Sequence, residues 1–174
     1  MSDLIKAKKA IYDISPYVGG ESKADAGRII KLSSNEGPFG PSPKAIAAVK
    51  NMTPEMNRYP DGGCLELRTA LAAKNNIKVD NIVCGAGSDE IIAFLCHSYA
   101  GEGDEVLYSA HGFLMYSIYA KTAGATSVSA PEKNLKANPE ALLNAVTEKT
   151  KLLFLANPNN PTGSYLTRDE ILDL

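Results

Sequence analysis

From Asn81 onward, short apolar runs alternate with segments of helical periodicity, and this alternation restricts the fold more than any other feature of the sequence. The expected strands are residues 82–84, 105–108, 126–129 and 151–155. The expected helices are residues 90–95, 115–123 and 140–146. Strands separated by helices form βαβ units. The pattern therefore predicts an α/β fold, a three-layer sandwich with a mostly parallel sheet covered by helices on both faces.

The first forty or so residues carry a different pattern, because prolines and glycines interrupt them. Within them, residues 28–32 form one apolar stretch that we expect to be an edge strand. Ser42 followed by Pro43 predicts the N-cap and first turn of a helix, and a second helix is expected over residues 65–74. We therefore expect an extended N-terminal arm that leads into the α/β domain.

Charge and composition favour a soluble substrate. The net charge of -2 and the isoelectric point near 5.7 give no electrostatic reason to expect binding to nucleic acid or to an anionic membrane. No stretch approaches the roughly 18 apolar residues that span a bilayer, and the N-terminus lacks the apolar core of a signal peptide. Cys64, Cys84 and Cys96 lack zinc-site spacing, so we expect reduced packing residues and no metal. These features predict a cytoplasmic protein.

Ligands of open parallel sheets bind beyond the carboxyl ends of the strands, so the residues that follow each apolar run are candidates for a site. Residues 85–90 form a small-residue turn that leads into a helix. Free amides and the positive end of the helix dipole at such a turn can hold one phosphate, bound around Ser88. The alternative is that Ser88 or Asp89 only caps the helix. A dinucleotide site fits poorly, because its third glycine would fall at Glu90.

The residues after the second expected strand place Phe113 on a turn before a helix. An aromatic face there can stack on a planar cofactor ring, although a phenylalanine in this position is more often part of the core. The same holds for Tyr116 and Tyr119. His111 is a candidate acid or base by residue type, and the alternative is that it is structural or solvated.

The segment that follows the last strand, residues 156–163, is the most specific of the three, since its two prolines and three asparagines continue a sheet poorly. A proline-braced turn can aim an asparagine amide at a polar ligand atom, and Asn160 directly precedes Pro161. The alternative is an ordinary turn rich in Asn, Pro and Gly.

Residues 157–163, Asn-Pro-Asn-Asn-Pro-Thr-Gly, resemble the asparagine-proline signature of fold-type I aminotransferases. Residues 34–43, 57–62 and 85–90 occur in the order and rough spacing of histidinol-phosphate aminotransferases, so the resemblance extends from about residue 17 to Leu174. It implies that residues 1–41 are an N-terminal arm with part of the small domain. Residues 42–174 would be the N-terminal part of the large domain, which binds pyridoxal phosphate.

The resemblance also implies a site for pyridoxal 5'-phosphate. Gly87, Ser88 and Asp89 match the residues that lie at the cofactor phosphate in the family. Phe113 takes the place of the aromatic residue that stacks on the pyridine ring, where many members have tyrosine. Asn160 matches the residue that faces the ring hydroxyl.

A homodimer with composite sites is a further implication. Tyr59 would reach the cofactor phosphate of the partner subunit, and Tyr17 and Asn35 match segments that line the substrate end of the pocket.

The implied activity is amino transfer between histidinol phosphate and 2-oxoglutarate, a step of histidine biosynthesis. In the family, a lysine holds the cofactor as a Schiff base, and the resemblance places that lysine beyond Leu174. We therefore expect no catalytic residue within the 174 residues, a sequence that is truncated in the helix opened by Thr167, and no activity from this chain alone.

Two alternatives stay open. One is another fold-type I enzyme, such as an aromatic or other amino-acid aminotransferase or a threonine-phosphate decarboxylase. The other is a non-catalytic module that binds a phosphate-bearing ligand or a partner protein.

Overall fold

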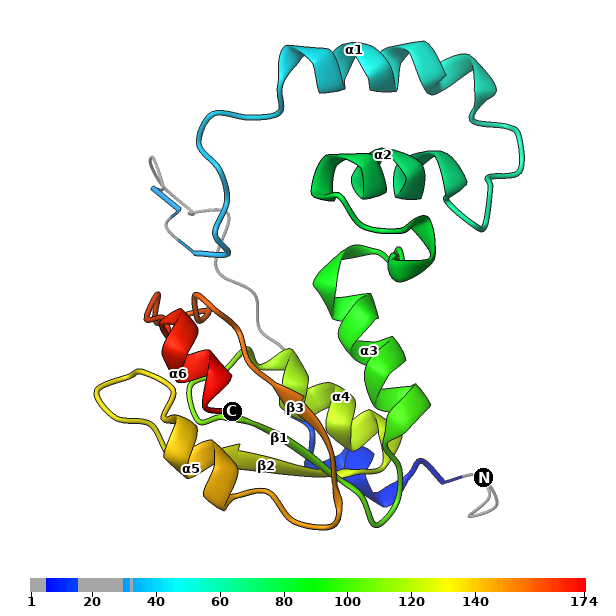
Figure 1. Cartoon of the computed structure of the whole chain (residues 1–174). Coiled ribbons are helices and arrows are strands. Elements are labelled where there is room, and N and C mark those ends of the chain that lie inside the picture. Colours follow the sequence, from blue (N-terminus) through cyan, green and yellow to red (C-terminus); the bar gives the residue numbers. More distant parts are fainter. Residues whose placement is uncertain (1–5, 16–29, 32) are drawn as a thin grey trace. The chain divides into compact units, whose positions relative to one another are not determined.

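The computed structural model describes residues 6–15, 30–31 and 33–174, which form two compact units (Figure 1). The sheet unit contains residues 6–15 and 83–174, and the helical unit contains the described residues from 30 to 82. Tyr17 and most of the expected strand over residues 28–32 lie outside the described residues. The domain boundary between residues 41 and 42 stays a prediction.

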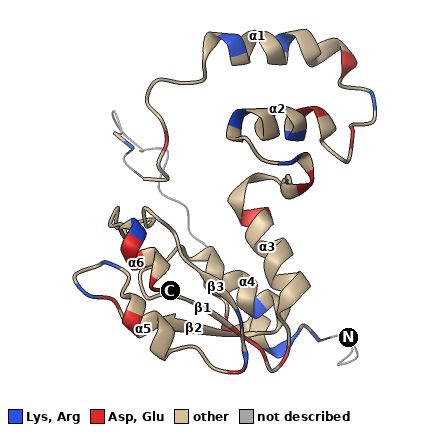
Figure 2. Cartoon of the chain, in the orientation of Figure 1, with Lys and Arg blue, Asp and Glu red and all other residues tan. Residues whose placement is uncertain are grey.

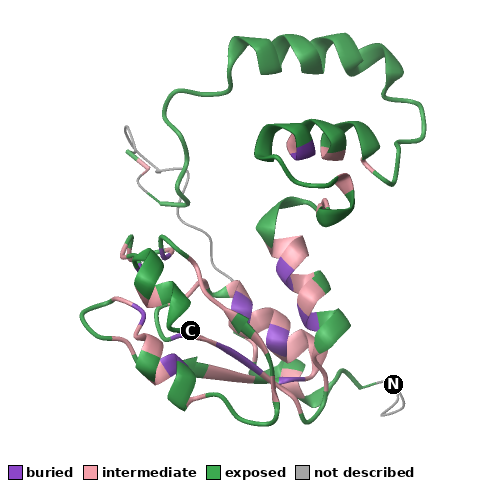
Figure 3. Ribbon diagram, in the orientation of Figure 1, coloured by how far each residue is buried: buried purple, intermediate pink, exposed green. Residues whose placement is uncertain are grey.

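The helical unit contains both helices expected before residue 80. Its elements are α1 (Pro43–Met52), η2 (Thr53–Glu55), α2 (Leu65–Asn75) and η3 (Val79–Asn81). The hydroxyl oxygen of Ser42 accepts a hydrogen bond from the Ala45 amide at 3.1 Å, which confirms the predicted N-cap. Ala72 is the one buried residue in these four elements, so most of their surface is exposed (Figure 3).

The sheet unit is built on three parallel strands in the order β2-β1-β3. They are β1 (Glu105–Ser109), β2 (Thr126–Ala130) and β3 (Thr150–Phe154), and they confirm the predicted parallel sheet. The expected strand at residues 82–84 was wrong. A strand exists through a ladder of hydrogen bonds to a neighbour, and this segment pairs with none of the described strands. Its Val83 is 72% exposed.

Helices cover both faces of this sheet, as the sequence predicts (Figures 1 and 3). Val106 and Leu107 of β1 are fully buried and, as neighbours in a strand, point to opposite faces. On the face of Val106 pack the helices α3 (Gly87–Tyr99) and α4 (Met115–Ala123). On the face of Leu107 packs α5 (Pro139–Asn144). The three-layer α/β sandwich is therefore confirmed.

Cys96 is fully buried in the cluster around Val106, as expected of a packing residue. The described residues hold no cluster of three or more side chains that could ligate a metal. Among the described helices, none is both long and apolar enough to cross a membrane.

The first described segment packs on the C-terminal end of α4. It forms the 3-10 helix η1 (Lys9–Asp13), so this part of the expected arm is not extended. The ammonium group of Lys8 donates hydrogen bonds to the carbonyl oxygens of Thr122 at 3.2 Å and Ala123 at 3.3 Å. A cation at the end of a helix complements the negative end of the helix dipole, which favours this docking.

The last helix, α6 (Arg168–Leu172), has Thr167 as its N-cap, as the sequence predicts. The Thr167 hydroxyl accepts from the Glu170 amide at 3.3 Å, and the Glu170 carboxylate accepts from the Thr167 amide at 2.7 Å, which is a complete capping box. The helix is short: Asp173 is its C-cap, and the Leu174 amide still donates to the Ile171 carbonyl oxygen at 3.2 Å.

Lys136 is a second partner of Glu170, since its ammonium group donates to the carboxylate at 2.6 Å. Basic and acidic residues are interspersed along the sheet unit, and Lys136 and Glu170 are one such pair (Figure 2). The bonds from Lys136 and then Thr167 lower the pKa of Glu170 from 4.5 to about 2.

Replacing Glu170 by glutamine is expected to destabilise the protein at neutral pH but not in strong acid. Because the folded pKa lies below the unfolded one, the ionised carboxylate stabilises the fold fully above about pH 4.5, and this contribution is lost as the pH falls towards 2. The urea midpoints of wild type and E170Q should differ at pH 7 and converge in acid. A difference that stays constant with pH would contradict this role of Glu170.

Candidate functional site

The segments that follow β1, β2 and β3 lie at one edge of the sheet, because parallel strands end on the same side. The N-terminus of α3 belongs to this edge as well. Residues 100–104 connect the C-terminus of α3 to the start of β1, so the helix runs antiparallel to the strand (Figure 1). The three segments that the sequence selects, residues 85–90, 109–113 and 156–163, therefore belong to one side of the sheet unit.

The N-terminus of α3 presents open backbone amides. Its N-cap is Ala86, whose side chain accepts no hydrogen bond from the first-turn amides, so the alternative that Ser88 or Asp89 is only a capping residue was wrong. The amides of Ser88 and Asp89, in the first turn, have no helical carbonyl to bind. Gly87 has a φ of +78°, which favours glycine, and its Cβ position has no atom within 4 Å. Glu90 folds back and accepts from the Ala86 amide at 2.7 Å. This end of α3 can hold an anion.

Phe113 follows a tight turn at the end of β1. The Gly112 amide donates to the Ser109 carbonyl oxygen at 2.7 Å, and a Cβ on Gly112 would lie 2.8 Å from that oxygen, so only glycine fits. The half-buried Phe113 ring meets Tyr116 edge to face, at 5.9 Å between centroids. Tyr116 is buried and stacks on Phe154 at 4.8 Å, so the interpretation of Tyr116 as a core residue is confirmed. Burial raises the pKa of Tyr116.

A buried carboxylate, Glu132, holds the turn between β1 and Phe113. Its side chain is 2% exposed and accepts hydrogen bonds from the Ser109 hydroxyl, the His111 amide (2.9 Å) and Nδ1 of the His111 ring (2.9 Å). Burial raises the pKa of Glu132, but these hydrogen bonds outweigh burial and hold it below its usual value. The serine bonds the carboxylate and not the histidine, so the three residues do not form a nucleophile with its base.

From the sequence, His111 had no visible partner, and Glu132 was not among the expected site residues. The partner comes from the segment after β2, 21 residues further along the chain. The available signal was the position of Glu132 three residues after the expected strand over residues 126–129, at the sheet edge where the residues after each parallel strand gather.

The segment after β3 is pinned by two of its three asparagines. The Asn159 side chain is buried and donates to the His111 carbonyl oxygen at 3.1 Å and to the Thr162 hydroxyl at 2.9 Å. The Asn157 side chain exchanges two hydrogen bonds with the backbone of Leu166, at 2.8 and 3.0 Å. Asn160 is half-buried in the same segment. The loop is thus a braced structure and not an ordinary turn.

The comparison with known proteins agrees with this architecture. The sequence matches the family described as "Aminotransferase class I and II" over residues 27–174. The chain belongs to this aminotransferase family.

Among the aminotransferases most similar to the chain is the histidinol-phosphate aminotransferase of Paramagnetospirillum magneticum, with 61% identity over 96% of this chain and 46% of the relative. The enzyme of the same name from Rhodospirillum rubrum is 54% identical over 96% of this chain and 46% of its own length. The solved histidinol-phosphate aminotransferase of Sinorhizobium meliloti, in complex with pyridoxal-5'-phosphate, has a TM-score of 0.76 and 28% identity, over 80% of this chain and 38% of that one. The chain therefore spans about half the length of its curated relatives.

The residues that the aminotransferase resemblance selects divide between the two units. Gly87, Ser88, Asp89, Phe113 and Asn160 all belong to the sheet unit, at the ends of β1 and β3 and at the start of α3. The Schiff-base lysine expected beyond Leu174 stays a prediction, because the structure ends at that residue.

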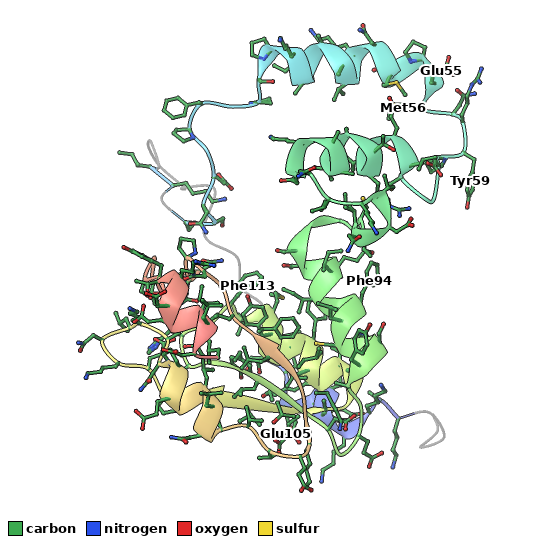
Figure 4. All side chains as sticks on the ribbon, viewed as in Figure 1. Glu55, Met56, Tyr59, Phe94, Glu105 and Phe113 are labelled. Atoms are coloured by element: carbon green, nitrogen blue, oxygen red, sulfur yellow. The ribbon has the colours of Figure 1, made fainter. Side chains whose placement is uncertain are left out.

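Tyr59 and Asn35 belong to the helical unit, and Tyr17 lies outside the described residues. Tyr59 is 97% exposed and follows the turn after η2, where Figure 4 shows it beyond Glu55 and Met56. Asn35 is exposed and has a φ of +52°.

Proposed function

We propose that the protein to which these residues belong is a pyridoxal 5'-phosphate-dependent aminotransferase that transfers an amino group between histidinol phosphate and 2-oxoglutarate, in histidine biosynthesis. The names of the relatives at 61% and 54% identity support the amino donor. The observation that carries the proposal is the uncapped start of α3 at the sheet edge that also holds Phe113 and the Asn157–Gly163 loop.

The start of α3 fits the phosphate of the cofactor. Ser88 is exposed, and its amide and that of Asp89 have no helical acceptor. The space at the Cβ position of Gly87 is open, so an anion can approach the backbone closely. The positive end of the helix dipole adds to the attraction for a dianionic phosphate. We assign Gly87, Ser88 and Asp89 to the phosphate site.

We propose that the pyridine ring lies between the turn that leads to Phe113 and the loop of residues 157–163. We assign Phe113 as the aromatic residue that stacks on the ring and Asn160 as the amide that faces the ring hydroxyl. When bound, pyridoxal phosphate supplies an electron sink for the carbanion formed at the substrate carbon. Phe113 and Asn160 would bind and orient the ring. A fixed ring orientation determines which bond of the substrate is placed for cleavage.

We assign no Schiff-base lysine within these residues and expect it beyond Leu174. Three lysines that flank the sheet have structural partners: Lys121 donates to the Asp13 carbonyl, Lys136 to the Glu170 carboxylate and Lys151 to the Glu148 carbonyl. Each is held at 3.5 Å or less by a group that has no part in the proposed site.

We also propose that the protein is a cytoplasmic homodimer in which Tyr59 reaches the cofactor phosphate of the partner subunit. Tyr59 is 97% exposed, which leaves its hydroxyl available for such a contact. Tyr17 and Asn35 are proposed to line the substrate end of the pocket.

The proposal is tested with the full-length protein, which is expected to transfer the amino group of histidinol phosphate to 2-oxoglutarate. Absence of this activity in protein that binds pyridoxal phosphate would point to another amine substrate. Absence of cofactor binding would contradict the proposal altogether.

Phe113→Ala is expected to raise the dissociation constant for pyridoxal phosphate about tenfold, because the ring loses its stacking partner. Phe94→Ala is the matched control. Phe94 is an aromatic residue of α3 that is 44% exposed and lies outside the strand-end loops (Figure 4). The dissociation constants of both variants are measured by titration with pyridoxal phosphate, monitored by the absorbance of the cofactor. Equal weakening in the two variants would argue against a stacking role for Phe113.

A further inference from the structure

His111 stands between the loops of the two neighbouring strands. On one side, its amide and ring donate to Glu132, which follows β2. On the other side, its carbonyl oxygen accepts from Asn159, which follows β3. Since β1 is the central strand of the order β2-β1-β3, these bonds connect all three strand ends through one residue.

The carboxylate of Glu132 is suited to this task because it can only accept hydrogen bonds when ionised. It receives three donors, from Ser109 and His111, while its side chain is 2% exposed. Ser109, the last residue of β1, is itself 4% exposed. Both oxygens of this buried carboxylate are occupied, so a shift of the His111 turn would leave a buried donor or acceptor without its partner, which is unfavourable.

The residues assigned to the cofactor ring are direct neighbours of this connection. Phe113 follows His111 by two residues, across the tight turn that Gly112 permits. Asn160 directly follows Asn159, whose side chain bonds His111. A shift of the His111 turn therefore moves both sides of the proposed ring site.

We propose that Glu132 is a positioning residue that sets the distance between Phe113 and Asn160 by fixing the His111 turn at the end of β1. This inference rests on the proposed binding of pyridoxal phosphate. In this proposal, the length of the Glu132 side chain and the position of its acceptor oxygens matter more than its charge. Glu132→Gln removes the charge and Glu132→Asp shortens the side chain, so the two variants separate these properties.

The two variants change opposite properties of the side chain. Glutamine keeps the length and one carbonyl oxygen, which can still accept from the His111 amide, and the imidazole can change tautomer to accept from the new amide group. Aspartate keeps the charge but is shorter by one methylene, so it cannot reach Ser109 and both donors of His111 together. The inference predicts greater damage from the aspartate.

The control is Glu105→Asp, at the opposite end of the same strand. Glu105 also links its strand to another segment, by accepting from the hydroxyls of Thr147 at 2.6 Å and Thr150 at 3.3 Å. Figure 4 places Glu105 and Phe113 at opposite ends of β1. Shortening Glu105 by one methylene should weaken the packing of the sheet unit without changing the proposed ring site.

The full-length protein with bound pyridoxal phosphate is measured in three ways: cofactor dissociation constant, induced circular dichroism of the cofactor band, and urea midpoint. For E132D we expect roughly tenfold to a hundredfold weaker binding, the effect of a misplacement of about 1 Å, and loss of most of the induced signal per bound cofactor. E132Q should stay within about threefold of wild type, and E105D should change only the urea midpoint.

Wild-type affinity and induced signal in E132D would overturn the inference, as would weaker binding by E132Q than by E132D. An equal loss in E105D would also overturn it, because general loosening would then explain the effect. A wild-type protein that binds no pyridoxal phosphate would refute the proposed function first and this inference with it, so the two failures are distinguishable.

Discussion

Leu142→Ala is expected to lower the free energy of unfolding by about 2–5 kcal/mol, the range found for leucines truncated in a close-packed core. Leu142 is fully buried and lies in the cluster that α5 forms with Leu107 of the central strand. Leu107 and Leu142 are the two large side chains of this cluster that are fully buried, so truncating Leu142 leaves a cavity beside the central strand. Urea denaturation of the full-length protein measures the loss.

The matched control is the next residue of the same helix. Leu143 is 46% exposed, so Leu143→Ala removes the same atoms from water-facing surface and should cost less than about 1 kcal/mol. The two leucines share the helix and the chemical change, and they differ in burial. A loss for Leu143→Ala as large as that for Leu142→Ala would show that helix stability and not core packing decides the outcome.

Asn159→Asp is expected to have the second large effect, on both stability and cofactor binding. The Asn159 amide donates to the His111 carbonyl and the Thr162 hydroxyl, and the residue is 7% exposed. A carboxylate in its place sets an acceptor against the carbonyl and buries a charge. Asn159→Ala removes the bonds without adding a charge, and should cost about 1–3 kcal/mol.

The aspartate should therefore be at least as destabilising as the alanine at neutral pH, and both should weaken binding of pyridoxal phosphate. Asn144→Ala is the control, since Asn144 is an exposed residue at the end of α5, and it should change stability by less than about 0.5 kcal/mol. Urea midpoints and cofactor titrations measure these effects. An aspartate variant more stable than the alanine variant would contradict the donor role of Asn159.

Local sequence patterns predicted most of the helices and strands, because these elements depend largely on interactions between residues close in the sequence. The helix over residues 115–123 has the predicted bounds, and Ser42 and Thr167 cap the helices that the sequence assigns to them. Capping depends on hydrogen bonds within four residues, so the sequence contains both partners. Residues 82–84 show the limit of this reasoning. Their apolar character is typical of a strand, but pairing needs a neighbour, and the described strands offer none.

The candidate site divides in the same way. The segments at residues 85–90, 109–113 and 156–163 could be selected from the sequence, because they follow apolar runs and contain residues that end a helix or a strand. Which asparagine braces the last loop could not be selected. Asn159 braces the loop by a hydrogen bond to His111, which lies 48 residues earlier in the chain. The order of Asn157, Asn159 and Asn160 in the sequence does not show which side chain is buried.

The sequence by itself determined the α/β class, the parallel order implied by alternating elements, and the family signature that leads to pyridoxal phosphate. These depend on period, capping and motif, which are properties of neighbouring residues. Only the tertiary structure decided that α3 starts without a side-chain cap, that Tyr116 is core, and that Glu132 and Asn159 hold His111 from two sides. Those contacts join residues brought together by the packing of β1 between β2 and β3, and their geometry exists only once the sheet has formed.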